Sequence, residues 1–359
     1  MPDYRRILII KPSSLGDVIH ALPTLAALRD RFPSAHIDWL VKRQWAGVLE
    51  RVEGLDRIWP IEAGLQGWLR MVRPLRAAAF DLVIDLQGLF RSGAIAWLTG
   101  CHTRVGFANA REGSRFCYTQ RVTVPLSDMH AVDRYLLIAS AVDASPKGAP
   151  EFRTRLAATD RDRIAQLLKS SGVSPGVPWI AMHVSARWDT KRWPPERFAA
   201  VADTLQAQRL GPVALIGSPD DRAATQAVIR RMQTMGIDLT GQTSAESLPA
   251  LLASARLLVT NDSGPMHIAA AMGTPVVALF GPTSPLRTGP YGAKHRVLRS
   301  GVPCSPCFSR ACRNPVQLEC LTTIDPKDVV DAVREQLKEV QGSTFEVRSF
   351  SDENKRVAE

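Results

Sequence analysis

A carboxylate opens the helix that is predicted to follow the first strand-like segment of the chain. Residues 6–11 form a short apolar run, and residues 12–16 then supply small polar side chains and one glycine before Asp17. An aspartate at this point can simply complement the dipole at a helix start. It can also act as a general base, because ligands of parallel α/β sheets bind beyond the carboxyl ends of the strands. The local sequence leaves both interpretations of Asp17 open.

The same loop occupies the position where dinucleotide-binding proteins carry G-x-G-x-x-G. That fingerprint is absent from the whole sequence, and so is the G-x-x-x-x-G-K-[ST] pattern of P-loop enzymes. Dinucleotide-dependent oxidoreductases and P-loop phosphotransferases are therefore disfavoured.

Two loops in the second half of the chain have residues suited to a diphosphate. The strand-like run 179–184 leads into Ser185 and Lys191, and a lysine at a strand end can reach a phosphate. An ordinary solvent-exposed lysine is the competing interpretation. The run 256–260 leads into Asn-Asp-Ser-Gly and a helix with small side chains, whose N-terminal N–H groups can hold a pyrophosphate. Helix capping explains an Asp-Ser pair at this position equally well.

Metal-ligand patterns are weak. The one Asp-x-Asp string, at 160–162, opens a predicted helix, so capping is its expected role and we predict a metal-free site with no cofactor. Four thiols lie within one short stretch, and their number suits a tetrahedral metal although their spacing is not that of a paired knuckle. For Cys304, Cys307, Cys312 and Cys320 we rank free structural thiols first, a zinc site second and disulfides third. Cys101 and Cys117 are isolated, and we expect them to be structural.

The elements that must position these loops alternate between strand and helix along the chain. Buried-type strands are predicted at 6–11, 36–41, 57–61, 81–86, 179–184, 212–216, 256–260 and 275–280, and helices at 17–31, 65–79 and 325–340. This order predicts α/β architecture with two doubly wound, Rossmann-like domains facing a central cleft. With 359 residues, two cores are expected. We assign residues 1–165 and 166–325 to the two domains, 326–341 to a C-terminal helix and 342–359 to a flexible tail.

Charge points to anionic partners. The net charge is +10, and residues 63–125 contain eight arginines against three acids. The basic residues never form a dense block, so we expect an anionic acceptor or a membrane surface rather than nucleic acid. No apolar run approaches the ~20 residues of a membrane span. The first apolar run is short and has no small-residue cleavage site after it, so a signal peptide is not expected and the protein is predicted to be cytoplasmic.

Taken together, these motifs resemble a known family. The chain combines Ser-Ser-x-Gly-Asp after its first strand, His…Lys-x-Trp-Pro, and Asn-Asp-Ser-Gly-x-x-His followed by Thr-Pro-x-x-x-x-Phe-Gly-Pro-Thr. In this combination it resembles the bacterial lipopolysaccharide heptosyltransferases over residues 6–340. The resemblance implies a GT-B fold, inverting transfer from ADP-heptose, and an acceptor in the lipopolysaccharide inner core at the cytoplasmic face of the inner membrane.

The resemblance also implies roles for single residues. Asp17 maps to the family's proposed base, with Ser14 and Gly16 in the same loop. The donor contacts map to Ser185, Lys191, Asp220, Thr243, Asp262, Ser263, Gly264 and His267. The acidic ribose contact is aligned loosely, so Asp221 remains an alternative to Asp220. A family threonine contact falls on Ala186, which can contribute only its backbone.

Two other functions compete with heptosyl transfer. A GT-B enzyme acting on another nucleotide sugar, such as a different glycan transferase or a UDP-sugar epimerase, would share the fold. An epimerase would need further acid–base carboxylates near the donor, and none stands out as Asp17 does. A non-catalytic nucleotide-sugar-binding protein would have no use for a base at Asp17.

Overall fold

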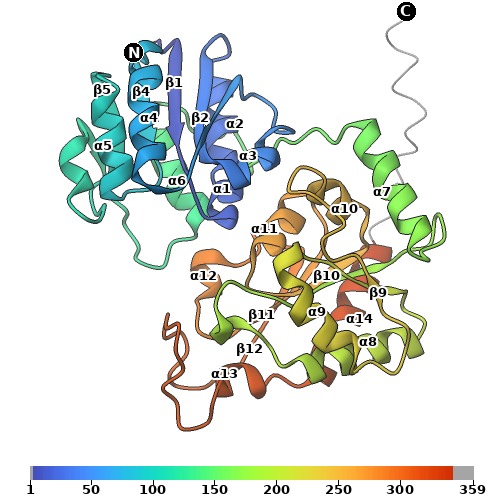
Figure 1. Cartoon of the computed structure of the whole chain (residues 1–359). Coiled ribbons are helices and arrows are strands. Elements are labelled where there is room, and N and C mark those ends of the chain that lie inside the picture. The colour runs from blue at the N-terminus through green and yellow to red at the C-terminus, as the bar shows by residue number, and fades with distance from the viewer. Residues whose placement is uncertain (1–2, 343–359) are drawn as a thin grey trace, which may run out of the picture.

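Two parallel β-sheets, each covered by helices, form the computed structural model of the chain, which describes residues 3–342 (Figure 1). The first sheet has the strand order β3-β2-β1-β4-β5-β6, and the second has the order β12-β11-β10-β7-β8-β9. Both orders reverse direction beside the first strand of the domain, as in doubly wound folds. The predicted α/β class with two Rossmann-like domains is confirmed.

The N-terminal domain alternates strands and helices. Its strands are β1 (Arg6–Ile10), β2 (His36–Lys42), β3 (Arg57–Ile61), β4 (Leu82–Asp85), β5 (Thr103–Phe107) and β6 (Gln120–Val122). Its helices are α1 (Leu15–His20), α2 (Leu22–Arg31), α3 (Arg43–Leu49), α4 (Gly64–Ala77), α5 (Phe90–Leu98), the 3₁₀ turn η1 (Ser114–Cys117) and α6 (Ala131–Ser140). The central strands are buried on both faces, so their side chains are apolar in succession rather than in alternation.

The C-terminal domain repeats this plan. Its strands are β7 (Ile180–His183), β8 (Val213–Leu215), β9 (Ile237–Asp238), β10 (Leu257–Asn261), β11 (Val276–Phe280) and β12 (His295–Arg299). Its helices and 3₁₀ turns are α7 (Ala158–Ser170), η2 (Asp189–Lys191), α8 (Pro195–Ala207), η3 (Pro219–Asp221), α9 (Arg222–Ile229), α10 (Leu248–Ser254), α11 (Gly264–Ala271), α12 (Pro285–Thr288), α13 (Glu319–Thr322) and α14 (Pro326–Gly342).

The structure differs from the sequence prediction at several elements. The single helix predicted at 17–31 is two helices, which separate at Ala21 because Pro23 has no N–H to continue the hydrogen-bond ladder of α1. Strands β5, β6, β9 and β12 were not anticipated, since they lie toward the sheet edges and lack continuous apolar runs. The expected domain boundary at residue 165 falls inside α7, so the exact division stays a prediction. From residue 343 onward, the expected tail lies outside the described residues.

The two domains meet where α1 packs directly against α11 (Figure 1). A Cβ atom placed on Gly16 of α1 would lie 2.3 Å from Cδ2 of His267 on α11. A Cβ atom on Gly264 of α11 would lie 2.7 Å from Cδ2 of Leu15 on α1. Real side chains do not approach so closely, so glycine at both positions permits this helix contact.

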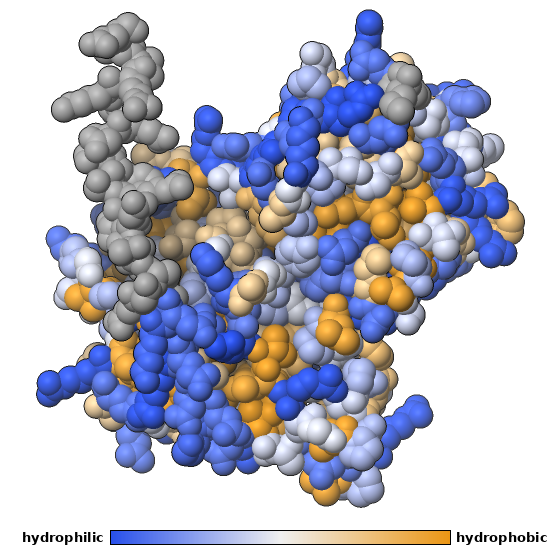
Figure 2. Space-filling view, turned by 180° about the vertical axis from the view of Figure 1, so that it is seen from behind, coloured by the Kyte–Doolittle hydropathy of each residue, from blue (hydrophilic) through white to orange (hydrophobic). Residues whose placement is uncertain are grey.

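The surface of the molecule is mixed in character. Seen from behind, hydrophilic residues cover much of both domains, with apolar groups between them (Figure 2). Within residues 3–342, no helix has both the length and the apolar character that crossing a membrane requires.

The close approach of α1 and α11 predicts that Gly16→Ala destabilises the domain contact. The added methyl group must displace the buried His267 ring, and overpacking of this kind costs about 1–3 kcal/mol. We expect a lower melting temperature and a larger radius of gyration by small-angle X-ray scattering. Gly148→Ala is the matched control, because a Cβ atom there meets nothing within 4 Å. Indistinguishable behaviour of the two variants would contradict this account of the junction.

Candidate active site

The Asp17 carboxylate lies at the start of α1 and accepts three hydrogen bonds. Its Oδ2 accepts from the Ser14 backbone N–H at 2.9 Å and from the Ser14 hydroxyl at 2.7 Å. Its Oδ1 accepts from the Tyr135 hydroxyl on α6 at 2.9 Å. The backbone bond to Ser14 is one half of a capping box, so the carboxylate does cap α1. The side chain is nevertheless 35% exposed, which leaves acceptor positions open to a ligand.

A buried lysine lies behind this carboxylate. Lys11, at the end of β1, donates from Nζ to the Leu86 carbonyl at 3.1 Å, and Nζ lies 3.8 Å from Oδ1 of Asp17. Burial alone would raise the pKa of Asp17, but the Lys11 charge and the Ser14 hydrogen bonds outweigh it and hold the pKa below its usual value. Asp17 is therefore an ionised, oriented carboxylate at neutral pH.

Three arginines add positive charge around the same point. Arg134 of α6 is part-buried, its Nε has no hydrogen-bond partner within residues 3–342, and its Nη2 donates to Asn109 at 3.4 Å. Arg111 and Arg287 act electrostatically on Arg134, and Arg111 and Arg134 act on Lys11. The surroundings of Asp17 are therefore electropositive, which suits an anionic ligand.

The loops predicted to bind the donor come together at the carboxyl edge of the second sheet. Lys191, in η2 after β7, pairs with Oδ2 of Asp262 at 2.6 Å. Thr283, after β11, donates from its hydroxyl to the same oxygen at 2.6 Å. Asp262 is almost fully buried, so this ion pair fixes the lysine over the start of α11. A lysine ammonium has three N–H donors, and two remain for a phosphate.

Ser263, the residue before α11, does not cap the helix with its side chain but belongs to a hydrogen-bonded group of side chains. Its hydroxyl lies 3.0 Å from Thr260 Oγ1 and 3.0 Å from Nδ1 of His183 at the end of β7. On the other side of that ring, Nε2 of His183 lies 3.7 Å from Oδ2 of Asp221. Burial would raise the pKa of Asp221, but the nearby His183 and Ser185 side chains and the hydrogen bond from the Ser218 hydroxyl hold it below its usual value. Asp221 is thus a fixed carboxylate beside the loop that carries Ser185.

The remaining predicted donor contacts have different surroundings. Asp220 is exposed in η3, whereas Asp221 accepts the Ser218 backbone N–H, and both stay candidates for the ribose contact. Thr243 is half-buried in the loop after β9, at the same sheet edge. Gly264 opens α11, and because Pro265 follows it, one of the N–H groups at this helix start is missing. The residue assignments themselves stay predictions.

Three histidine rings fill the junction between the loop that carries Asp17 and the loop that carries Asp262. The His20 ring lies edge-on to His267, with centroids 4.3 Å apart, and to His130, with centroids 5.1 Å apart. Within residues 3–342, both ring nitrogens of His20 lack a hydrogen-bond partner, and so does Nδ1 of His267. Burial lowers the pKa of all three histidines, and that of His267 to about 4. At neutral pH the cluster is therefore uncharged, and His267 lies within electrostatic reach of both Asp17 and Asp262.

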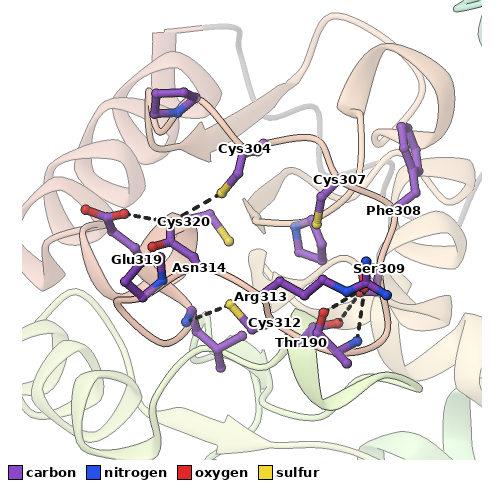
Figure 3. A pocket seen from close by; sticks show the side chains of 16 residues that line it. Thr190, Cys304, Cys307, Phe308, Ser309, Cys312, Arg313, Asn314, Glu319 and Cys320 are labelled. Carbon is purple, nitrogen blue, oxygen red and sulfur yellow. Dashed lines mark hydrogen bonds between the residues drawn. The ribbon is translucent and has the colours of Figure 1, made fainter.

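The four clustered cysteines lie away from this junction, around a pocket of about 750 Å³ that is lined mainly by the loop linking β12 to α13 (Figure 3). Cys320 is buried, and burial with the neighbouring thiols raises its pKa to about 11. Asn314 donates to Sγ of Cys304 at 3.4 Å, and the Leu318 N–H donates to Sγ of Cys312 at 3.3 Å. All six cysteines are free. Among residues 3–342, no three His, Cys, Asp or Glu side chains are grouped to hold a metal, and the free-thiol ranking stays a prediction.

Sequence reasoning missed part of the site. Tyr135 binds Asp17 from 118 positions away in the sequence, and nothing in its local pattern marks it. Lys11 and His20 flank Asp17 in the chain, yet a lysine at a strand end and a histidine in a helix have no special role without their burial. Trp193 is a packing residue, since it is 2% exposed and its ring lies edge-on to Phe198.

Because the histidines in the junction are uncharged when folded, we expect the stability of the protein to fall as the pH is lowered. Unfolded His267 binds a proton near pH 6.5, whereas the folded residue does so only at about 4. Between these pH values the unfolded state binds a proton that the folded state does not. The free energy of unfolding therefore falls as the pH is lowered, by about 3 kcal/mol in total for this one histidine. We expect urea unfolding to show that lowering the pH reduces the free energy of unfolding less in His267→Gln than in the unsubstituted protein. The same loss in both proteins would contradict the assignment.

Comparison with known proteins places the chain in a family. The family described as "Glycosyltransferase family 9 (heptosyltransferase)" matches residues 68–317. Lipopolysaccharide heptosyltransferase 1 of Pseudomonas aeruginosa is 30% identical over 325 residues, which are 86% of this chain and 87% of the relative. The crystal structure of a family 9 glycosyl transferase from Veillonella parvula is 28% identical with a TM-score of 0.82, covering 94% of this chain and 98% of that one. The structure of E. coli ADP-heptose LPS heptosyltransferase II is 25% identical with a TM-score of 0.76, and the match covers 94% of this chain and 99% of that one.

The two sheets therefore form a GT-B fold, and the chain is an enzyme that belongs to glycosyltransferase family 9, the heptosyltransferases.

Proposed function

We propose that this enzyme transfers heptose from ADP-heptose to a sugar of the lipopolysaccharide inner core, with inversion and without a metal or other cofactor. The observation that carries the proposal is the meeting of two loops at the α1–α11 contact. The Asp17 carboxylate comes from one domain, and the Lys191–Asp262 pair at the start of α11 comes from the other. The names of the Pseudomonas and E. coli relatives support heptose as the sugar.

The geometry suits a single in-line displacement. The acceptor hydroxyl loses its proton to Asp17 as its oxygen attacks the anomeric carbon of the donor sugar. The bond from that carbon to the diphosphate oxygen breaks on the opposite side, and the negative charge that develops there is stabilised by Lys191 and the N-terminal end of α11. His267, next to both loops, helps to shield the reacting atoms from water.

The acceptor side suits an acidic sugar. Arg134 has an unpartnered Nε, and Arg111, Arg287 and Lys11 surround the same region. These groups can neutralise a carboxylate or phosphate on the acceptor while Asp17 faces its hydroxyl. Because inner-core acceptors are glycolipids, we place the enzyme at the cytoplasmic face of the inner membrane, as a peripheral protein.

Replacing the base tests the chemistry. Asp17→Asn keeps the shape of the side chain and a helix-capping acceptor but removes its basicity. We expect kcat to fall by about 10²–10⁴-fold, with the donor KM and melting temperature little changed. Ser14→Ala is the matched control, because it removes the hydroxyl bond to Asp17 and leaves the carboxylate in place. If Asp17→Asn retains activity within a few-fold of the unsubstituted enzyme, Asp17 is a cap and not the base.

Nucleotide binding tests the donor. ADP should raise the melting temperature, because a ligand present at about 100 times its Kd stabilises the folded state by about 2.7 kcal/mol. Lys191→Met should reduce that shift, since it removes the ammonium from the start of α11. Activity with ADP-heptose and a lipopolysaccharide acceptor, followed by mass spectrometry, should survive EDTA. Equal stabilisation by UDP, or activity lost in EDTA and restored by Mg²⁺, would count against the donor and the metal-free mechanism respectively.

A further inference from the structure

Large apolar side chains are exposed in one region of the N-terminal domain. Leu65 and Leu69 on α4 are 68% and 57% exposed, and Phe90 and Trp97 on α5 are 58% and 60% exposed. Phe116 of η1 is 69% exposed. Eleven large hydrophobic side chains are exposed in the described chain, and these five belong to three adjoining elements. Single exposed hydrophobic residues are ordinary, but a concentration of this kind indicates an interaction surface.

Helix geometry puts these residues on the outer side of the domain. α4 and α5 pack against each other and cover the same face of the first sheet through Trp68, Leu75 and Ile95 (Figure 1). On α4, Leu65 and Leu69 are four residues apart, so they share one face of the helix. The inner faces of both helices therefore pack against the core, whereas their outer faces have no partner in the described chain.

Arginines surround the exposed apolar side chains. Those on α4, α5 and near η1 are Arg70, Arg73, Arg76, Arg91, Arg115 and Arg121, all of them exposed. Within residues 3–342, none of these six forms an ion pair with an acid. Two of them stack on the exposed Phe116 ring, with Arg115 at 4.9 Å and Arg121 at 5.8 Å from its centroid. Stacked guanidinium groups leave their charge available to an outside anion.

The acids of the same stretch do not offset this charge. Asp81 accepts the backbone N–H groups of Arg5 and Arg6, and Glu112 accepts the backbone N–H of Phe90. Asp85 is buried and accepts from the Tyr118 hydroxyl. The exposed face thus combines apolar side chains with arginines that no acid pairs, which is the composition of an interfacial membrane-binding surface.

We propose that this α4–α5 surface, made of Leu65, Leu69, Phe90, Trp97, Phe116 and the six arginines, binds the anionic surface of a phospholipid bilayer. The proposal rests on the proposed function in one respect, the glycolipid nature of the acceptor. α4 follows β3 and α5 follows β4, so both helices begin at the carboxyl edge of the sheet, where Asp17 follows β1. An enzyme docked through Leu65 and Phe90 would hold that edge against the headgroups, where the sugar of a glycolipid lies.

Vesicle binding tests the surface without any assay of transfer. The unsubstituted protein should sediment with vesicles that contain phosphatidylglycerol and remain in solution with vesicles of pure phosphatidylcholine. Each basic side chain near an anionic surface contributes a factor of about five in affinity, so Arg70→Gln/Arg73→Gln/Arg76→Gln should bind roughly a hundredfold more weakly. Leu65→Ser/Leu69→Ser should also lose binding, because it removes the side chains that enter the bilayer. Arg163→Gln/Met235→Ser, on exposed positions of the other domain, is the matched control and should bind normally.

Fluorescence gives a readout at one side chain. Brominated phosphatidylglycerol should quench part of the protein's tryptophan emission, and Trp97→Phe should remove that part. Failure of the unsubstituted protein to bind anionic vesicles would overturn the proposal. So would equal binding by the control and the α4 variants, or a dimer in solution that the leucine substitutions dissociate without any vesicle binding.

An acceptor comparison separates this proposal from the proposed function. If both hold, the α4 variants transfer heptose normally to a delipidated, water-soluble acceptor and poorly to the same acceptor embedded in vesicles. If no heptose is transferred to either acceptor but the vesicle results stand, the proposed function fails and the membrane surface remains. If transfer to the embedded acceptor is unaffected in variants that no longer bind vesicles, the surface does not serve the reaction.

Discussion

The contact between α1 and α11 is the constraint on which the rest of the site depends. Each helix starts just beyond a central strand of its sheet, and each presents a glycine to the other at the point of closest approach. Because each glycine leaves room only for a side chain of the other helix, His267 against Gly16 and Leu15 against Gly264, the carboxylate at the start of α1 and the lysine–aspartate pair at the start of α11 are brought to opposite sides of one junction. A bulkier residue at Gly16 or Gly264 would separate two groups that are useful only together.

Each domain contributes one lysine–aspartate pair, but the two pairs are built for different purposes. In the first, Lys11 is buried and its ammonium is held by a backbone carbonyl, so Asp17 is the partner that faces outward. In the second, Asp262 is buried and Lys191 is the partner that faces outward. Burial of one ion and partial exposure of the other decides which charge is offered to a ligand. A carboxylate is thereby offered on one side of the junction and an ammonium group on the other, with each buried partner fixing its orientation.

Much of this arrangement could be predicted from sequence, because it depends on local pattern. Runs of buried apolar residues identify the central strands, and in parallel sheets the loops after such strands gather at one edge. Asp17, Lys191 and Asp262 were found in this way. Tyr135 was not, because its bond to Asp17 depends on how α6 packs against α1 rather than on any feature near it in the chain. The proximity of Asp221 rather than Asp220 to His183 likewise depends on how η3 turns, and adjacent acids have no sequence signal for that. Short edge strands such as β9, two residues long, carry too little pattern to be recognised.

The pairing of Lys191 with Asp262 has a consequence for the end of the catalytic cycle. A diphosphate that has lost its sugar carries more negative charge than the intact donor, and an unpaired lysine would retain it tightly. Here the buried carboxylate, itself held by Thr283, keeps part of the lysine's charge occupied at all times. Under the donor contact proposed for Lys191, the spent nucleotide would meet a cation that is already partly neutralised and a neighbouring negative charge that repels it. On that proposal, the pair that holds the donor diphosphate would also favour release of the nucleotide product.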